Sequence, residues 1–427
     1  MLRQRLLTIG LAAVWTIVVI GTVFVHGRWL WHPNIARGDT AAIERHLTRS
    51  LEQAVADGKI GSAALVLMER GQIVTERGFG VAHAEAQEPF KPDRTLYQLA
   101  SVSKTVTAWG VMKLVQDGKI RLDEPVLPHL RRWRFPGSGS YADGVTVRHL
   151  LSHTAGLDDG LGYGGFLAGE TPQTLENSLS DAKDSTVGRP RAVVVVREPG
   201  RAISYSGGGY TVLQLLVEEL TKRPFAEYMA DAVLTPLGMN KATFDIDDLA
   251  AEDRARDLAT AYDLKVKPQP HRRHTAKASV ALLASARDMA HFLRANVVNN
   301  PVLRPHTLDQ MLRPQPGTSG TWGLGYTLFA ATDSDDYVVG HDGGSPPAWG
   351  AMLRLNRATG NGMVLMVSGG SGAVNQLGHD WVYWETGIVT SAARRQILYD
   401  RVGPALVVVV LGVIAIVLFV KRRLTLA

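Results

Sequence analysis

Cysteine is absent from all 427 residues of this chain. Disulfide bonds, a thiolate nucleophile and a cysteine-ligated zinc site are therefore excluded. The 13 histidines show no HExxH or other metal-ligand spacing, so we expect no metal site. The cellular compartment stays open, because many proteins outside the cytoplasm contain no disulfides.

Several motifs of common enzyme classes are also missing. The chain contains no GxxxxGK[ST] or GxGxxG in the required context, so we expect no nucleotide or other cofactor. The nearest approach to a GxSxG elbow surrounds Ser371 and ends in Ala373 instead of glycine. The net charge is +6, but the basic residues are dispersed apart from residues 131–134 and 271–274. We interpret them as solvated surface and expect no nucleic-acid partner.

Two long apolar runs lie near the ends of the chain, at residues 6–25 and 402–420. Each is close to the roughly 20 residues that cross a bilayer, so we predict two transmembrane helices. Basic residues outside both runs, Arg3 and Arg5 at one end and Lys421 at the other, favour cytoplasmic termini. The predicted domains are then an anchor and linker (1–39), an extracytoplasmic body (40–390), periplasmic or extracellular, and a linker with a second membrane helix (391–427). The alternatives are a cleaved signal peptide for the first run and a buried core helix for the second.

Over the whole chain 45% of the residues are hydrophobic, which is enough to bury a large core. Residues 41–51 have a helical pattern, and two strand-like runs follow, joined at Gly71 in the manner of a hairpin. Further strand-like runs fill residues 322–368, after a helix candidate that Ser285 would cap. The pattern predicts an α+β fold, in which an antiparallel sheet built from both ends of the body is flanked by helices, with a helical insertion at about 122–264.

The strongest chemical signal is the tetrad SVSK, in which Ser101 precedes Lys104 at the front of an apolar helical run. A hydroxyl needs a base within hydrogen-bond reach, and a lysine three positions on lies on the same helical face. The run that includes Val106 and Trp109 has the spacing of a helix that buries one face. An ordinary N-cap serine is the alternative for Ser101. A second SxxK match at Ser180 lies in a polar stretch, which we interpret as surface.

Three further stretches follow in order: LLSHTAGL at 150–157, YSGGGY at 205–210 and GHDGG at 340–344. Together with SVSK they resemble the serine β-lactamase-related family, which includes class C β-lactamases, D-Ala-D-Ala carboxypeptidases, D-amino-acid peptidases and a group of esterases. Its motifs run SxxK, YxN and then KTG or HxG. The resemblance extends from about residue 40 to 387 and implies a penicillin-binding-protein-like fold with catalytic Ser101, Lys104 and Tyr205.

The resemblance also implies roles for the remaining motif residues. Tyr205 would relay protons with a pKa lowered by the nearby Lys104, and His341 would bind a substrate carbonyl or carboxylate. Gly343 and Gly344 would let substrate lie along the strand, and the backbone N–H groups of Ser101 and Gly344 would form the oxyanion hole. His153, in LLSHTAGL, is interpreted as a structural histidine.

Two positions depart from the family pattern. Gly207 replaces the asparagine of YxN, and His341 replaces the lysine of KTG, a fixed cation suited to a β-lactam carboxylate. We therefore predict a membrane-anchored esterase or D-amino-acid-type peptidase that acts on a small-molecule or peptide substrate of the cell envelope. The alternatives are a non-catalytic envelope binding or sensor protein of the same fold and a penicillin-recognising enzyme.

Overall fold

The computed structural model describes residues 10, 12–19, 35–137, 139–159, 162–186, 192–251, 254–334, 336–345, 349–370, 372, 374–397 and 403–425. The chain divides into two compact units. The larger is Leu47–Trp381, and the smaller combines Met1–His46 with Val382–Ala427. The candidate site lies wholly within the larger unit.

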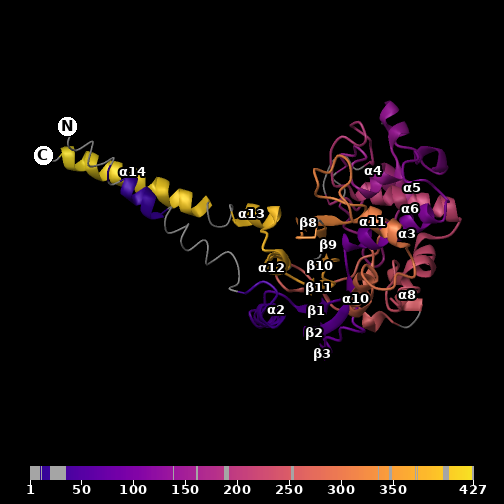
Figure 1. Cartoon of the computed structure of the whole chain (residues 1–427), viewed down its shortest axis with the longest axis horizontal. Coiled ribbons are helices and arrows are strands. Elements are labelled where there is room, and N and C mark those ends of the chain that lie inside the picture. The colour runs from indigo at the N-terminus through magenta and orange to yellow at the C-terminus, as the bar shows by residue number, and fades with distance from the viewer. Residues whose placement is uncertain are drawn as a thin grey trace. The chain divides into compact units, whose positions relative to one another are not determined.

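A seven-stranded antiparallel sheet forms the centre of the larger unit (Figure 1), in the order β3-β2-β1-β11-β10-β9-β8. Its strands are β1 (Ser62–Glu69), β2 (Gln72–His83), β3 (Glu88–Pro89), β8 (Thr327–Ala331), β9 (Tyr337–Ser345), β10 (Trp349–Asn356) and β11 (Asn361–Ser368). At the middle of the sheet β1 pairs with β11, so that Leu65 lies opposite Leu365. The prediction of a sheet built from both ends of the body is confirmed.

Short paired strands join segments outside this sheet. They are β4 (Tyr97–Gln98) with β7 (Leu283–Ala284), and β5 (Ala261–Tyr262) with β6 (Pro268–Gln269). The first pair links the chain just before Ser101 to Leu283 and Ala284, so these two segments are held side by side.

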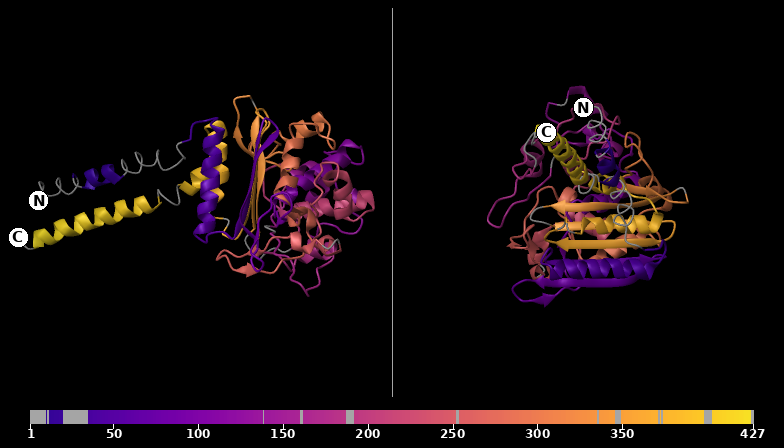
Figure 2. Two further views of the ribbon diagram at one scale, coloured as in Figure 1. Left: turned by 90° about the horizontal axis from the view of Figure 1, so that it is seen from below. Right: turned by 90° about the vertical axis from the view of Figure 1, so that its left-hand side faces the viewer.

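Helices cover both faces of the sheet within the larger unit (Figure 2). They are α2 (Thr40–Ala56), α3 (Val102–Gln116), α4 (Val147–Leu151), α5 (Leu175–Asp181), α6 (Gly207–Thr221), α7 (Phe225–Met229), α8 (Ile246–Ala251), α9 (Lys277–Val280), α10 (Ala286–Ala295), α11 (Pro305–Met311) and α12 (Asn375–Thr386). The parts of α2 and α12 inside this unit lie along one face, and the others lie on the opposite face. The predicted cap of α10 is confirmed, because Ser285 forms a capping box with Asp288.

Helix α3 differs from the one-sided helix that its sequence predicts. Val106 and Trp109 are fully buried, and so are the polar residues Ser103 and Thr107 on other sides of the helix. Thr107 Oγ1 donates to the carbonyl of Ala278 at 2.9 Å. A helix buried on nearly all sides hides its polar groups only because each finds a partner, so α3 is the central, rigidly held helix of the domain.

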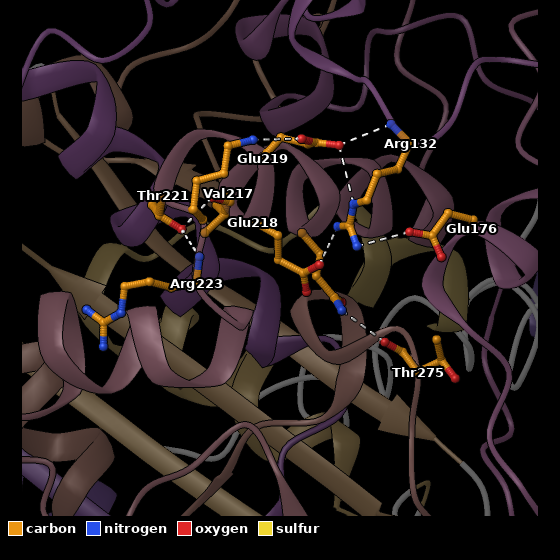
Figure 3. A network of polar contacts seen from close by, with 10 residues as sticks. Arg132, Glu176, Val217, Glu218, Glu219, Thr221, Arg223 and Thr275 are labelled. Atoms are coloured by element: carbon orange, nitrogen blue, oxygen red, sulfur yellow. Dashed lines mark hydrogen bonds and ion pairs between the residues drawn. The ribbon is translucent and has the colours of Figure 1, made fainter.

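Arg132, one of the basic residues at 131–134 that were predicted to lie at the surface, is part of an ion-pair network (Figure 3). Arg132 contacts the carboxylates of Glu176, Glu218 and Glu219, and Lys222 also pairs with Glu219. Arg132 is shared between three carboxylates and so links α5 to α6 at the surface.

The smaller unit includes α13 (Ser391–Ile397) and α14 (Gly403–Thr425). Helix α14 covers the second predicted membrane run, whereas only residues 10 and 12–19 of the first run are described. In the part of the chain that the structure describes, no helix has the combined length and apolarity that crossing a membrane requires. The predicted transmembrane helices are therefore unsupported by the structure.

Candidate active site

Ser101 and Lys104 meet at the start of α3. Lys104 Nζ lies 3.1 Å from Ser101 Oγ and donates a second hydrogen bond to the carbonyl of Ser279 at 2.9 Å. That carbonyl belongs to α9, which packs against α3. The spacing of three residues along one helix brings the hydroxyl and the amine together, and the α9 carbonyl fixes the direction of the amine.

Burial changes the acid–base properties of Lys104. Its side chain is 1% exposed, and this loss of hydration lowers its pKa from 10.5 to about 7. The carboxylate of Asp159 acts in the opposite direction but is the smaller influence. A large fraction of Lys104 is therefore a neutral amine near neutral pH, which is the form that can remove a proton from Ser101.

The backbone around Ser101 excludes the alternative of a simple N-cap. Ser101 has helical dihedral angles (φ −65°, ψ −14°), and its side chain makes no capping hydrogen bond. The preceding residue, Ala100, has a φ of +47°, a conformation that residues with a Cβ rarely adopt. Strain of this kind persists only where the surrounding structure enforces it, and it is common at functional sites.

Tyr205 reaches the serine from the loop before α6. Backbone hydrogen bonds from Gly200 to Thr154 and from Ser204 to His153 hold this loop against the LLSHTAGL segment. The phenol hydrogen bonds with Ser101, and Lys104 Nζ lies 5.0 Å from the centre of the ring. The structure thus brings together the three residues that the resemblance implied.

The expected pKa of Tyr205 is wrong in direction. Burial of the hydroxyl raises its pKa above the ordinary value, and the bond to Ser101 offsets this only in part. The residue as a whole is 44% exposed, so the burial that raises the pKa is that of the hydroxyl and not of the whole residue. Tyr205 consequently stays a protonated phenol, which leaves Lys104 as the candidate base.

His153 is buried and structural, as its sequence context predicts. Its Nδ1 accepts a hydrogen bond from the backbone N–H of Ser206 at 3.1 Å, and its ring lies 4.4 Å from that of Tyr205. Burial holds its pKa well below the usual range. Ser206 Oγ in turn donates to Asp159 Oδ2 at 2.6 Å. His153 therefore fixes the position of the tyrosine through both the backbone and the ring.

His341 lies on β9 and is 2% exposed. Nδ1 donates to the carbonyl of Asp342 at 2.6 Å, which leaves Nε2 as an acceptor, and this atom has no hydrogen-bond partner among the described residues. Burial, aided by the charge of Lys104, lowers its pKa to about 4. The imidazole is thus neutral, and the adjacent Asp342 carries a carboxylate that pairs with Arg354 at 2.6 Å.

The two predicted glycines of β9 lie beside the start of α3. A Cβ on Gly343 would lie 2.3 Å from the Leu99 carbonyl oxygen and 3.3 Å from the Ser101 nitrogen. Gly344, the next residue, has open space, with its nearest neighbour 3.9 Å away. Gly207 is buried as the first residue of α6 and presents no side chain toward the site. The close approach of β9 to Ser101 therefore depends on Gly343.

Other predicted features lie away from this cluster. Ser180 is exposed, as expected, but it lies within helix α5, whose polar sequence had not suggested a helix. Ser180 Oγ donates to Glu176 within that helix and accepts from the Trp133 indole. Three cavities of about 290, 450 and 510 Å³ lie around the body, and none of the three includes Ser101, Lys104 or Tyr205 in its lining.

Sequence reasoning missed Trp322 and Ser279. Trp322 packs edge-on against His341, with ring centres 5.5 Å apart, and against Tyr205 at 5.9 Å. Its Nε1 is buried without a hydrogen-bond partner among the described residues. Neither residue lies in a recognisable motif, and Ser279 contributes only its backbone carbonyl, so no sequence signal pointed to them.

Known proteins share both the sequence pattern and the fold. The Beta-lactamase family profile matches residues 47–387. The chain is 22% identical to Protein flp of Staphylococcus aureus (strain MW2) over 326 residues, which cover 76% of this chain and 63% of that protein. It therefore spans less than two thirds of this relative's length.

A second relative is Esterase EstB of Burkholderia gladioli, 30% identical over 336 residues, which cover 69% of this chain and 81% of the esterase. Among solved structures, the β-lactamase/D-alanine carboxypeptidase from Yersinia pestis in complex with citrate has a TM-score of 0.62 and 22% identity. That similarity covers 80% of this chain and 98% of the other. The chain belongs to the β-lactamase family.

Proposed function

We propose that this protein is a serine hydrolase that cleaves esters through an acyl-enzyme on Ser101, with amides of D-amino-acid type as the second substrate class. The observation that carries the proposal is the buried Lys104 amine, 3.1 Å from Ser101 Oγ and with a pKa of about 7. An activated serine supports acyl transfer in general. The similarity to Esterase EstB favours ester substrates.

In the proposed reaction, neutral Lys104 takes the proton from Ser101 Oγ as the oxygen attacks the carbonyl carbon. The backbone N–H groups of Ser101 and Gly344 stabilise the resulting oxyanion. Tyr205, which hydrogen bonds with Ser101, passes the proton to the leaving oxygen or nitrogen. Water then attacks the acyl-enzyme by the same route in reverse, and no cofactor takes part.

The charges around His341 favour substrates without a carboxylate next to the scissile bond. The imidazole is neutral above about pH 5, and the carboxylate of Asp342 beside it is already paired with Arg354, so His341 supplies no cation to this place. A β-lactam or a D-Ala-D-Ala peptide carries a carboxylate at this place, which a cation would bind and a neutral ring does not. We therefore expect the penicillin-recognising activity to be the weaker alternative.

Mass spectrometry after exposure to a fluorophosphonate tests the nucleophile. We expect one adduct on the wild-type protein, located on Ser101 and lost in Ser101→Ala. Ser180→Ala is the matched control, because it removes the other SxxK serine, and it should keep the adduct. No adduct on the wild type, together with measurable ligand binding, would contradict the proposal in favour of a non-catalytic binding protein.

A substrate comparison tests the class. We expect neutral p-nitrophenyl esters to be hydrolysed with a higher kcat/KM than carboxylate-bearing esters of the same acyl length. D-Ala-D-Ala peptides and D-amino-acid amides extend the panel to amides. Preference for the carboxylated substrates, or a stable adduct with a β-lactam, would instead support the penicillin-recognising alternative.

We also propose that the hydrolase body lies outside the cytoplasm, held at a cell membrane by the chain ends. This rests on the two apolar runs and their basic flanks in the sequence. Membrane fractionation of the full chain, with protease added to intact cells, tests it. Recovery of the protein in the soluble cytoplasmic fraction would contradict the proposal.

A further inference from the structure

Three buried ring nitrogens that have no hydrogen-bond partner among the described residues lie next to Tyr205: His153 Nε2, His341 Nε2 and Trp322 Nε1. The rings of His341 and Trp322 have centres 5.5 Å apart. Both rings also lie within about 6 Å of the Tyr205 ring, at 6.2 and 5.9 Å. A buried polar atom that lacks a partner destabilises the fold, so such atoms persist mainly where a ligand or water satisfies them.

Of these three, the nitrogens of Trp322 and His341 have hydrogen-bonding roles that are opposite and fixed, whereas His153 Nε2 carries a proton because its Nδ1 accepts from Ser206. Indole Nε1 can only donate. His341 Nδ1 carries the proton that it donates to the Asp342 carbonyl, so Nε2 can only accept. A water molecule matches this pair: its oxygen accepts from Trp322 and one hydrogen is donated to His341. Its second hydrogen remains for the Tyr205–Lys104 relay, and one lone pair remains for attack.

We propose that Trp322 and His341 hold the hydroxyl compound that attacks the acyl-enzyme, and that the acceptor atom of His341 selects water over alcohols. The proposal rests on the acyl-enzyme function proposed above. An alcohol has one hydrogen, which must pass to the relay, so it has none for His341 Nε2. An alcohol bound in this place leaves His341 Nε2 without a hydrogen bond and facing a carbon atom. Transfer of the acyl group to an alcohol is therefore disfavoured.

The chemical step balances without any further reactant. The water oxygen forms a bond with the acyl carbon, and one proton moves through Tyr205 to Lys104. The bond between the acyl carbon and Ser101 Oγ then breaks, and Oγ takes the proton from Lys104. The hydrogen held by His341 stays on the new carboxyl group and is released to solvent with the product.

Partitioning of the acyl group between water and methanol tests the proposal on the full-length protein. A p-nitrophenyl ester is turned over at a fixed methanol concentration, and the free acid and methyl ester are quantified. We expect His341→Leu to raise the ratio of methyl ester to acid about 10-fold, because the acceptor atom is lost. His341→Gln retains a carbonyl acceptor and should stay close to the wild-type ratio. Trp322→Phe should slow the formation of the free acid and of the methyl ester equally, because the indole N–H can donate to either water or methanol.

Two outcomes would overturn the inference. The first is an unchanged ratio of methyl ester to acid in His341→Leu. The second is an equal shift of this ratio in His341→Leu and His341→Gln, which would indicate that the shape of the side chain matters and not its hydrogen bond. Fluorophosphonate labelling of Ser101 in each variant shows that the site is folded, and His341→Met replaces the leucine variant if that one is not labelled. Wild-type protein that is neither labelled nor active would refute the proposed function itself. Normal labelling with an unchanged ratio would refute only the role of His341.

Discussion

At the scale of single residues, the properties of the site depend on the protonation of Lys104. Its base form is the neutral amine, and burial sets its pKa at about 7. We therefore expect the rate of Ser101 labelling to rise with pH through about 7 and to level off above it. Lys104→Met should lower the plateau rate at least 100-fold and remove the inflection. A wild-type profile that is flat between pH 6 and 8 would contradict the assignment of Lys104 as the base.

The same pKa predicts how stability depends on pH. In the unfolded chain Lys104 titrates near 10.5, whereas in the fold it titrates near 7, so between these values the unfolded state binds more protons. The free energy of unfolding should therefore rise with pH from about 7 to 10.5, by at most about 1.4 kcal/mol per pH unit from this group. Urea unfolding of the wild type and of Lys104→Met at pH 7 and 9 isolates the contribution of Lys104 to the pH dependence of stability, because the two proteins share every other titratable group. Equal changes in the two proteins would show that Lys104 is not buried as described.

Sequence reasoning succeeded at this scale where the interaction is local. Ser101 and Lys104 are three residues apart on one helix, so their contact follows from helical geometry alone. The pKa of Tyr205 was predicted in the wrong direction, because the charge of Lys104 was weighed without the larger effect of burial. Burial and partners such as the Ser279 carbonyl come from distant parts of the chain, so no local pattern reports them.

At the scale of elements, the approach of β9 to α3 depends on one glycine. A Cβ at Gly343 would collide with the Leu99 carbonyl oxygen at 2.3 Å, whereas a Cβ at Gly344 would have its nearest neighbour at 3.9 Å. Gly343→Ala should destabilise the fold by about 1–3 kcal/mol and slow labelling of Ser101, because the strand must move away from the nucleophile. Gly344→Ala keeps the backbone N–H and should change stability by no more than about 0.5 kcal/mol.

Thermal unfolding and labelling rates of the two glycine variants test this difference. They are a matched pair, since both add one methyl group to adjacent positions of the same strand. If Gly344→Ala were the more damaging change, the space around β9 would differ from that described. Equal and small effects in both variants would show that β9 does not press against the start of α3.

Most elements of the sheet were predictable because their patterns are strong. Strands β1 and β11 are buried along nearly their whole lengths and read as continuous apolar runs between turn signals. Helix α5 was not predicted, since its sequence LENSLSD is polar and its stability comes from a Thr174 cap and packing of two leucines. The prediction that α3 is buried on one side only was wrong for a similar reason. In the sequence, polar side chains that form hydrogen bonds inside the protein cannot be told apart from polar side chains that face solvent.

At the scale of the whole molecule, the central strands come from opposite ends of the body. Strands β1 and β11 are neighbours in the sheet although their paired residues Leu65 and Leu365 are 300 positions apart. Pairing of such distant segments requires closure of a very long loop, which slows folding and makes it depend on an almost complete chain. The candidate catalytic residues Ser101, Lys104 and Tyr205 lie on segments between these strands, so their arrangement follows from closure of the sheet.

Two truncations separate the contribution of sheet closure from that of the chain ends. A fragment of residues 35–397 retains all seven strands and every residue of the candidate site, and we expect it to be labelled at Ser101 at a rate within about twofold of the full chain. A fragment of residues 35–360 retains Ser101, Lys104, Tyr205 and His341 but lacks β11, which leaves the facing edges of β1 and β10 unpaired. It should neither fold cooperatively nor be labelled. Labelling of the shorter fragment would show that the site forms without the central pairing, and loss of labelling in the longer one would show that the chain ends are needed for it.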